Sequence, residues 1–151
     1  MKYAHSVKLT VFSYEHENLD SISESFLKLF PFNLEQNKVI LKKTQATGFN
    51  EKKIKILEAT LTKNSLINDF LKNTLDKLDE SQKNQVLGQI ESRLDKNLDF
   101  FLRFDKNEWI DGKKLILTDG GKCFHIRISI AAFPKKKEIA LNIMRNLFSQ
   151  K

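Results

Sequence analysis

The spacing of the hydrophobic residues changes several times along this chain, and that change constrains the fold more than any other feature. Between residues 6 and 14, Val7, Leu9 and Val11 alternate with other residues, which predicts a strand with one buried face. From residue 64 to 78 the apolar residues recur three and four positions apart, which predicts a helix. Segments of the two kinds do not alternate regularly, so a doubly wound parallel sheet is excluded.

Over the whole chain the spacing predicts six strands and four helices in the order β-α-β-β-α-α-β-β-β-α. The expected strands cover residues 6–14, 38–44, 53–62, 98–104, 115–117 and 123–133. The expected helices cover residues 18–30, capped by Asn18, residues 64–78, capped by Asn64, residues 80–94, and a last segment after Pro134. These elements predict an α+β fold with a mainly antiparallel sheet.

The length of 151 residues fits one domain, and no repeat or flexible linker divides the chain, so we expect a single domain over residues 1–151. No apolar run reaches the roughly 18 residues that span a bilayer, and residues 1–10 lack the layout of a signal peptide. The single cysteine, Cys123, cannot form an internal disulfide. We therefore expect a soluble cytoplasmic protein that has no membrane partner and is stabilised by packing.

The positive charge of the chain is concentrated in two segments. Lys and Arg number 26 against 19 Asp and Glu, which gives a net charge of +7. The excess lies in residues 38–63 and 113–151. Such a distribution favours a polyanionic partner such as RNA, although lysines also serve as ordinary solvated surface.

Motifs for nucleotide cofactors and metals are missing from the sequence. The chain has no GxxxxGK[ST] and no GxGxxG segment, and the pair Gly120 and Gly121 lies between two expected strands, where a hairpin turn explains it. His5, His16 and His125 lack the paired spacing of metal ligands. We therefore expect no cofactor and no metal.

The sequence does not indicate catalysis either. Cys123 and His125 lie two apart on one face of an expected strand and could approach each other, but a strand cysteine is usually a core residue. Four carboxylates could bind Mg²⁺ in a nuclease, although their spacing does not separate them from surface residues: Glu58, Asp99, Asp105 and Asp111. We therefore expect no catalytic residues and no enzyme activity.

The expected strand from residue 123 to 133 and the residues after it carry the most informative pattern. Alternation places His125 and Arg127 on the polar side of the strand, which predicts a cationic sheet face. The first turn of the helix after Pro134 is expected to hold Lys135, Lys136 and Lys137. A helix dipole disfavours cations there, so the three ammonium groups indicate a phosphate site, and a solvated lysine run is the alternative.

A second basic block surrounds a loop between two expected strands. Its lysines include Lys42, Lys43, Lys53 and Lys55. The loop carries Phe49, an aromatic residue that could stack on an RNA base or could equally cap the core. The same two interpretations apply to three aromatic residues on the polar faces of other strands: Phe12, Tyr14 and Phe101.

A third segment of interest is LRFDKNEWIDG, at residues 102–112. It places Arg103, Asp105 and Lys106 at the end of an expected strand, before Trp109. These residues fit an ion-paired corner and a ligand-facing edge equally well.

Three segments together resemble one family. They are ATGFNEKKIKILEATL at residues 46–61, LRFDKNEWIDG at residues 102–112, and FHIRISIAAFPKKKE at residues 124–138. Each is similar to a segment of the archaeal RNA-binding proteins described as predicted exosome subunits. The family pattern has a glycine-aromatic loop before an ILEA-type strand, an LRxDK run, and a strand of the form xHxRIxxxAxP that leads into basic residues.

This resemblance implies an α+β domain similar to the RNA-contacting domain of the large-subunit ribosomal protein called L-five. It also implies RNA binding, with exosome or ribosomal proteins as further partners. The family pattern falls on Gly48, Phe49, Arg103, Asp105, Lys106, His125, Arg127, Lys135, Lys136 and Lys137. One departure is that Glu51 and Lys52 stand where relatives often have another glycine.

The leading hypothesis is a non-catalytic RNA-binding protein that contacts phosphates through the basic residues named above and stacks bases on Phe49 or on sheet aromatics. It would act as an accessory of the archaeal RNA-degrading exosome, or in ribosome or RNA processing. The alternative is an adaptor whose basic surface docks an acidic partner subunit. A third hypothesis is a hydrolase that uses the carboxylates and His125. The sequence selects no class of RNA and no oligomeric state.

Overall fold

The described part of the chain contains five strands and five helices. The computed structural model describes residues 1–150 except for the side chain of Phe49, so the last residue of the expected domain lies outside the described residues. The strands are β1 (Ala4–Tyr14), β2 (Lys42–Thr47), β3 (Lys53–Leu61), β4 (Asp99–Asp105) and β5 (Cys123–Ile130). The helices are α1 (Leu19–Leu27), α2 (Asn64–Asp76), α3 (Glu80–Gly88), α4 (Lys106–Gly112) and α5 (Lys137–Phe148), and a 3-10 turn, η1 (Phe49–Glu51), joins β2 to β3.

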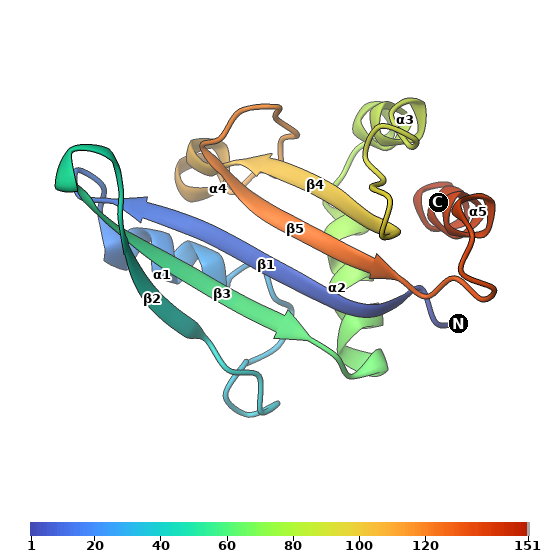
Figure 1. Cartoon of the computed structure of the whole chain (residues 1–151), viewed down its shortest axis with the longest axis horizontal. Helices are drawn as coiled ribbons and strands as arrows, with labels where there is room; N and C mark the ends of the chain where they lie inside the picture. Colours follow the sequence, from blue (N-terminus) through green and yellow to red (C-terminus); the bar gives the residue numbers. More distant parts are fainter. Residues whose placement is uncertain (151) are drawn as a thin grey trace. The chain divides into compact units, whose positions relative to one another are not determined.

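The strands form one sheet in the order β2-β3-β1-β5-β4, with neighbours running antiparallel (Figure 1). In the β2–β3 hairpin, Lys42 lies opposite Glu58 and Thr47 lies opposite Lys53. The α+β fold with a mainly antiparallel sheet, which the hydrophobic spacing predicted, is therefore confirmed.

The contacts within the chain define two compact units. Unit 1 contains residues 1–7, residues 61–102 and the chain from Ile126 onward, and unit 2 contains residues 8–60 and 103–125. The division falls within β1, β4 and β5 and before the last residue of β3, so each of these strands contributes to both units. A single domain over the whole chain stays a prediction.

In unit 2, α1 and α4 cover one side of the strands. The side chain of Asn18 caps α1 by accepting a hydrogen bond from a first-turn backbone amide at 3.1 Å, as the sequence predicted. The ring of Phe26 in α1 lies 6.5 Å from that of Phe124 in β5, between centroids. The indole of Trp109 in α4 donates a hydrogen bond to the carbonyl of Ser25 at 2.8 Å. These contacts bury the apolar side of the strands against α1.

In unit 1, α5 packs against β4 and α3. The rings of Phe148 in α5 and Phe100 in β4 lie 5.8 Å apart, and α3 contacts α5. Helix α2 buries an apolar stripe that includes Ile67 and Phe70. The spacing of three and four that predicted these helices is thus the spacing of their buried residues.

Most predicted elements have somewhat different bounds in the structure: the helix expected at residues 18–30 ends at Leu27, and the strand expected at residues 123–133 ends at Ile130. β2 begins at Lys42 instead of Lys38, because Lys38 has a φ of 59° and a strand cannot continue through that conformation. The expected cap Asn64 is the first residue of α2, and the cap position holds Lys63, which makes no side-chain cap hydrogen bond. Helix α3 ends at Gly88 instead of residue 94, at a residue type that disfavours a helix interior.

The segment between β4 and β5 also differs from the expected consecutive strands. The expected strand at residues 115–117 forms a single bridge, between Leu117 and Phe104, and helix α4 precedes it. This helix begins where Asp105 accepts a hydrogen bond from the backbone amide of Glu108 at 2.9 Å. An acidic cap followed by Glu three residues later is a known start signal, so the sequence contained the information for α4.

A buried ion pair connects α4 to the turn that follows β1. The Lys106 side chain is 2% exposed, and its ammonium lies 3.0 Å from Oε1 of Glu17. The same ammonium donates a hydrogen bond to the carbonyl of Phe12 at 2.7 Å and lies 5.2 Å from the ring centre of Tyr14. Burial alone would raise the pKa of Glu17, but hydrogen bonds from the Tyr14 amide and from Lys106 hold that pKa below its usual value.

Replacing Lys106 by Met should lower the free energy of unfolding by about 3 kcal/mol, because the carboxylate of Glu17 and the carbonyl of Phe12 both lose a buried partner. Urea denaturation measures this loss. The double variant Lys106→Met/Glu17→Gln should lose less than the sum of the two single changes, since it leaves no unpaired charge behind.

The same pair makes stability depend on acid. Because the pKa of Glu17 is lower in the folded chain, its contribution is present above the unfolded value, near 4.5, and is lost as the pH falls through the folded pKa. Lys106→Met should therefore flatten the decline of stability between neutral and acid pH. An unchanged free energy of unfolding and an unchanged decline would contradict the role of the pair.

Candidate nucleic-acid interface

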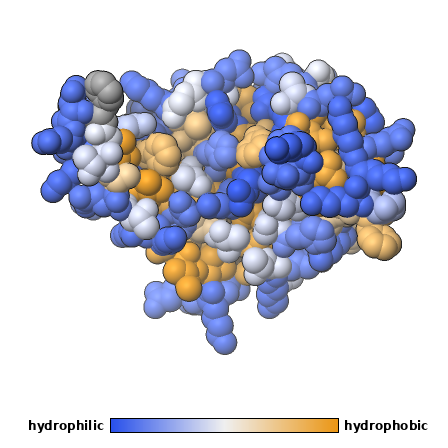
Figure 2. Space-filling model, viewed as in Figure 1, coloured by the Kyte–Doolittle hydropathy of each residue, from blue (hydrophilic) through white to orange (hydrophobic). Residues whose placement is uncertain are grey.

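The strands of unit 2 present one face that points away from α1 and α4. Strand alternation puts these residues on it, and we call them the open face: Lys8, Thr10 and Phe12 of β1, Arg103 of β4 and His125 of β5. Phe12 is 41% exposed, whereas its strand neighbours Leu9 and Val11, on the other side, are buried. Figure 2 shows apolar groups, in orange, between hydrophilic groups on the viewed side of the molecule. Unit 2 therefore offers an accessible aromatic ring on a polar sheet face.

Two side chains of the open face, Arg103 and His125, lie on neighbouring strands at the same level. The pairing of β4 with β5 is fixed by hydrogen bonds from the amide of Ile130 to the carbonyl of Leu98 and from the amide of Lys106 to that of Lys122, both at 3.1 Å. In this register Arg103 stands opposite His125. The Arg103 side chain is exposed, and its one described hydrogen bond, to the carbonyl of Asp119, is long at 3.4 Å. Its guanidinium is thus available to a ligand.

Arg127 follows His125 on the same side of β5 and belongs to unit 1. In the register given above it stands opposite Phe101, and beside it Ser129 donates a hydrogen bond to the carboxylate of Asp99 at 2.8 Å. The Nε atom of Arg127 is buried and has no hydrogen-bond partner among the described residues. An unsatisfied buried donor costs about 1–3 kcal/mol.

The segment at residues 102–112 forms an ion-paired corner. Asp105 caps α4, Trp109 is 3% exposed, and Lys106 forms the buried pair described above. The prediction that Lys106 contacts RNA therefore does not fit the structure, because its ammonium is enclosed and already has three acceptors. Of the basic residues in this segment, Arg103 keeps an exposed side chain.

The lysines of the β2–β3 hairpin do not share one face. Lys42 lies opposite Glu58, whose carboxylate forms an ion pair with Lys8 of the open face at 3.3 Å. Lys43 lies opposite the buried Leu57 and therefore points to the other side, as do Lys53 and Lys55, which also have odd positions in β3. One RNA strand on the open face can reach Lys42 but not the other three.

The loop at the tip of the hairpin adopts a left-handed backbone at two successive residues. Asn50 has a φ of 61° and Glu51 a φ of 60°. Asparagine tolerates this conformation, but glutamate does not favour it, and a glycine would adopt it without strain. This is the position at which the resembling family often has another glycine. The side chain of Phe49, predicted to stack on bases, lies outside the described residues.

The lysine run after β5 lies mostly before the last helix instead of within its first turn. α5 begins at Lys137, and Lys136 occupies the cap position with an extended backbone and no side-chain cap hydrogen bond. Helix α5 begins three residues after Pro134, so Pro134 does not serve as the first residue of the helix. All three lysines, Lys135 included, are exposed, and the first turn carries Glu138, which suits the helix dipole.

The groups that a hydrolase would need have structural roles. Burial raises the pKa of the Cys123 thiol, more than the nearby charge of Arg103 lowers it, so the sulfur stays protonated at neutral pH. Three carboxylates are engaged: Glu58 with Lys8, Asp99 with Ser129, and Asp105 at the α4 cap. Among the residues that the structure describes, no group of three His, Cys, Asp or Glu side chains is placed to hold a metal ion.

Comparison with known proteins gives a family. A family model described as RNA binding matches residues 6–130, most of the chain. The chain belongs to this RNA-binding family. It is 25% identical to an RNA-binding protein of Pyrococcus abyssi over 142 residues, which cover 94% of this chain and 92% of that one. The RNA-binding assignment that the sequence motifs implied is thus confirmed at the level of the family.

Solved structures with this fold come from archaea. The crystal structure of a DUF54 protein from Archaeoglobus fulgidus is similar with a TM-score of 0.84 and 28% identity, covering 95% of this chain and 99% of that one. A DUF54 protein from Sulfolobus solfataricus gives a TM-score of 0.73 and 27% identity, covering 93% and 98%.

None of the helices in the described part of the chain has the length and apolar character that crossing a membrane requires.

The sequence interpretation undervalued Phe12. It left two interpretations of this residue open, stacking on an RNA base and capping the core, although its place between Val11 and Ser13, both buried, puts it on the opposite side of the strand. The alternation of β1 was therefore the signal that identifies Phe12 as a surface residue.

Replacing Glu51 by Gly should raise the free energy of unfolding by about 1 kcal/mol, because it relieves a left-handed conformation that costs a side-chain residue roughly 1–2 kcal/mol. Thermal denaturation measures the gain. Glu51→Ala is the matched control, since it removes the same charge but keeps the Cβ atom. Equal stabilisation by both substitutions would show that the charge, and not the backbone, is responsible.

Proposed function

We propose that this chain is a non-catalytic RNA-binding protein of the cytoplasm that holds unpaired RNA on the open face of unit 2. The observation that carries the proposal is the exposed ring of Phe12 on the same sheet face as Arg103 and His125. Stacking of a base on an aromatic ring contributes about 1–3 kcal/mol and tolerates any base sequence. Membership of the RNA-binding family supports this function.

Phosphate contact would come from exposed cations. Arg103 has the planar guanidinium that binds phosphate with two hydrogen bonds, and its single long hydrogen bond leaves it free to move toward a ligand. Lys42, the first residue of β2, lies on the same side of the sheet and adds a second positive charge. Arg127, which belongs to unit 1, stays a separate predicted contact, whose guanidinium would donate hydrogen bonds to phosphate oxygens.

Fluorescence anisotropy with a labelled single-stranded oligouridylate at two salt concentrations tests the proposal. Phe12→Ala should weaken binding about tenfold, because the stacking platform is lost. Arg103→Ala should weaken binding and reduce the log-log salt slope by about 0.7, the value for one phosphate on a single strand. Phe133→Ala, at a side chain that is 95% exposed, and Arg145→Ala, at an exposed arginine of α5, are the matched controls.

Controls that weaken binding as much as Phe12→Ala and Arg103→Ala would overturn the open face as the site. Changing Lys135, Lys136 and Lys137 together to Ala tests the other predicted contact. A tenfold loss would add these lysines to the phosphate site. Unchanged affinity would leave them as solvated surface. Turnover of the RNA during the assay would contradict the non-catalytic part of the proposal.

The link to the RNA-degrading exosome rests on the family resemblance alone. Purification of the tagged chain after nuclease treatment tests it, because a protein contact survives the removal of RNA.

A further inference from the structure

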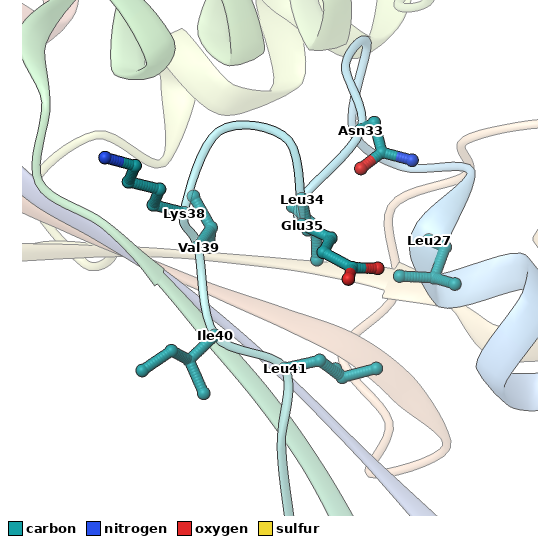
Figure 3. A pocket seen from close by; sticks show the side chains of 8 residues that line it. All are labelled: Leu27, Asn33, Leu34, Glu35, Lys38, Val39, Ile40 and Leu41. Atoms are coloured by element: carbon teal, nitrogen blue, oxygen red, sulfur yellow. The ribbon is translucent and has the colours of Figure 1, made fainter.

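An apolar groove lies in unit 2 beside the start of β2. It has a volume of about 670 Å³ and is lined on one side by Leu27, at the end of α1, and on the other by the segment at residues 33–41. Figure 3 shows Leu41 and Glu35 pointing toward Leu27, while Lys38 points away. Leu27 is 42% exposed and Ile40 is 81% exposed, so the groove is an accessible apolar surface on a strongly polar chain.

The groove leads directly into the free edge of the sheet. β2 is the last strand of the sheet on its side, and all six of its residues are exposed. The amide of Gly48 donates a hydrogen bond to the carbonyl of Lys52 at 2.6 Å. This hydrogen bond determines which backbone groups of β2 point toward β3. In this register the amides and carbonyls of Lys43, Gln45 and Thr47 point outward. Such an edge is a template for one more strand.

The charges around this edge select an acidic occupant. The side of the hairpin that carries Lys43 also carries Lys53 and Lys55. Lys55 donates a hydrogen bond to the neutral Gln45, and the backbone amide of Lys53 donates one to the carboxylate of Glu15 at 2.9 Å, so this side holds three lysines beside one carboxylate. Leu41 lies two residues before Lys43, so its side chain points to the same side of the extended chain, and it lines the groove. This side of the hairpin therefore adjoins the groove. Glu35 lies at the groove itself, so the group that enters there must be uncharged.

We infer that the β2 edge and the adjoining groove bind an extended acidic segment of a protein partner. The segment adds to β2 as a strand, places an apolar side chain in the groove between Leu27 and Leu41, and sets its carboxylates against the lysines of the hairpin. A second copy of this chain is disfavoured, because it would bring the same lysines to the interface. RNA is disfavoured because the lining residues of the groove include no aromatic ring, and the lining cation, Lys38, points away from the groove. The inference does not depend on RNA binding at the open face.

Anisotropy with a short labelled peptide of alternating leucine and glutamate tests this inference, with the leucine-lysine peptide as the matched probe. The acidic peptide should bind at least tenfold more tightly than the basic one. Leu27→Asp should weaken binding of the acidic peptide about tenfold, because it places a like charge in the groove. Ile116→Asp, at another apolar side chain of unit 2 that is 38% exposed, should leave binding unchanged.

A second variant tests the added strand separately from the groove. Gln45→Pro removes one outward amide, and proline is tolerated on a strand edge, so the fold should survive while peptide binding is lost. Circular dichroism checks the fold, and unchanged oligouridylate binding confirms that the open face is intact.

Three results would overturn the inference. The first is equal binding of the two peptides, and the second is binding that Leu27→Asp and Gln45→Pro leave unaltered. The third is a dimer in sedimentation that Leu27→Asp converts to monomer, because the edge would then belong to a second copy. If oligouridylate binding were the property that Leu27→Asp abolished, the groove would be part of an RNA site instead.

Discussion

The buried ammonium of Lys106 is the interaction on which the arrangement of unit 2 depends. It binds the Glu17 carboxylate, which follows β1, and the Phe12 carbonyl, which lies within β1, while its own backbone starts α4. A lysine is costly to bury, and the cost is offset only when the charge is paired and its hydrogen bonds are satisfied. Because the acceptors come from the end of β1, the pair fixes that end against α4. The backbone carbonyl of Phe12 is therefore held in place by the buried ammonium.

Alternation then decides what that backbone displays. In unit 2, strands β1, β4 and β5 bury apolar residues on the side of α1, so the residues between them must face the other way: Lys8, Thr10 and Phe12 on β1, Arg103 on β4 and His125 on β5. The same packing that stabilises the core thus presents an aromatic ring and two cations together. The requirement for RNA is a flat face with a stacking group and donors, and a half-buried antiparallel sheet supplies it without any dedicated loop.

The sequence predicted most of this fold, because the spacing of the apolar residues follows from which side of each helix or strand is buried. It predicted less where the outcome depends on contacts distant in the chain. From the sequence alone, Lys106 is expected at the surface, because its buried partner, Glu17, lies far earlier in the chain. The separation of Lys42 from Lys43 depends on the hairpin register, which composition does not encode. The sequence prediction did not include helix α4, because its capping residue, Asp105, directly follows the strand pattern of residues 98–104.

The net charge of +7 includes the charges of two surfaces that differ in their chemistry. The open face joins Arg103 to an exposed ring, and a guanidinium binds phosphate while the ring takes a base. The β2 edge joins lysines to free backbone groups and to an apolar groove, which suits a peptide because a peptide can pair with the backbone and a nucleotide cannot. RNA bound at the open face, as proposed, would release counterions, whereas a peptide bound at the edge would gain much of its free energy from hydrogen bonds and apolar burial. Salt should therefore weaken the first interaction more steeply than the second, and this difference lets the two surfaces be told apart in one protein.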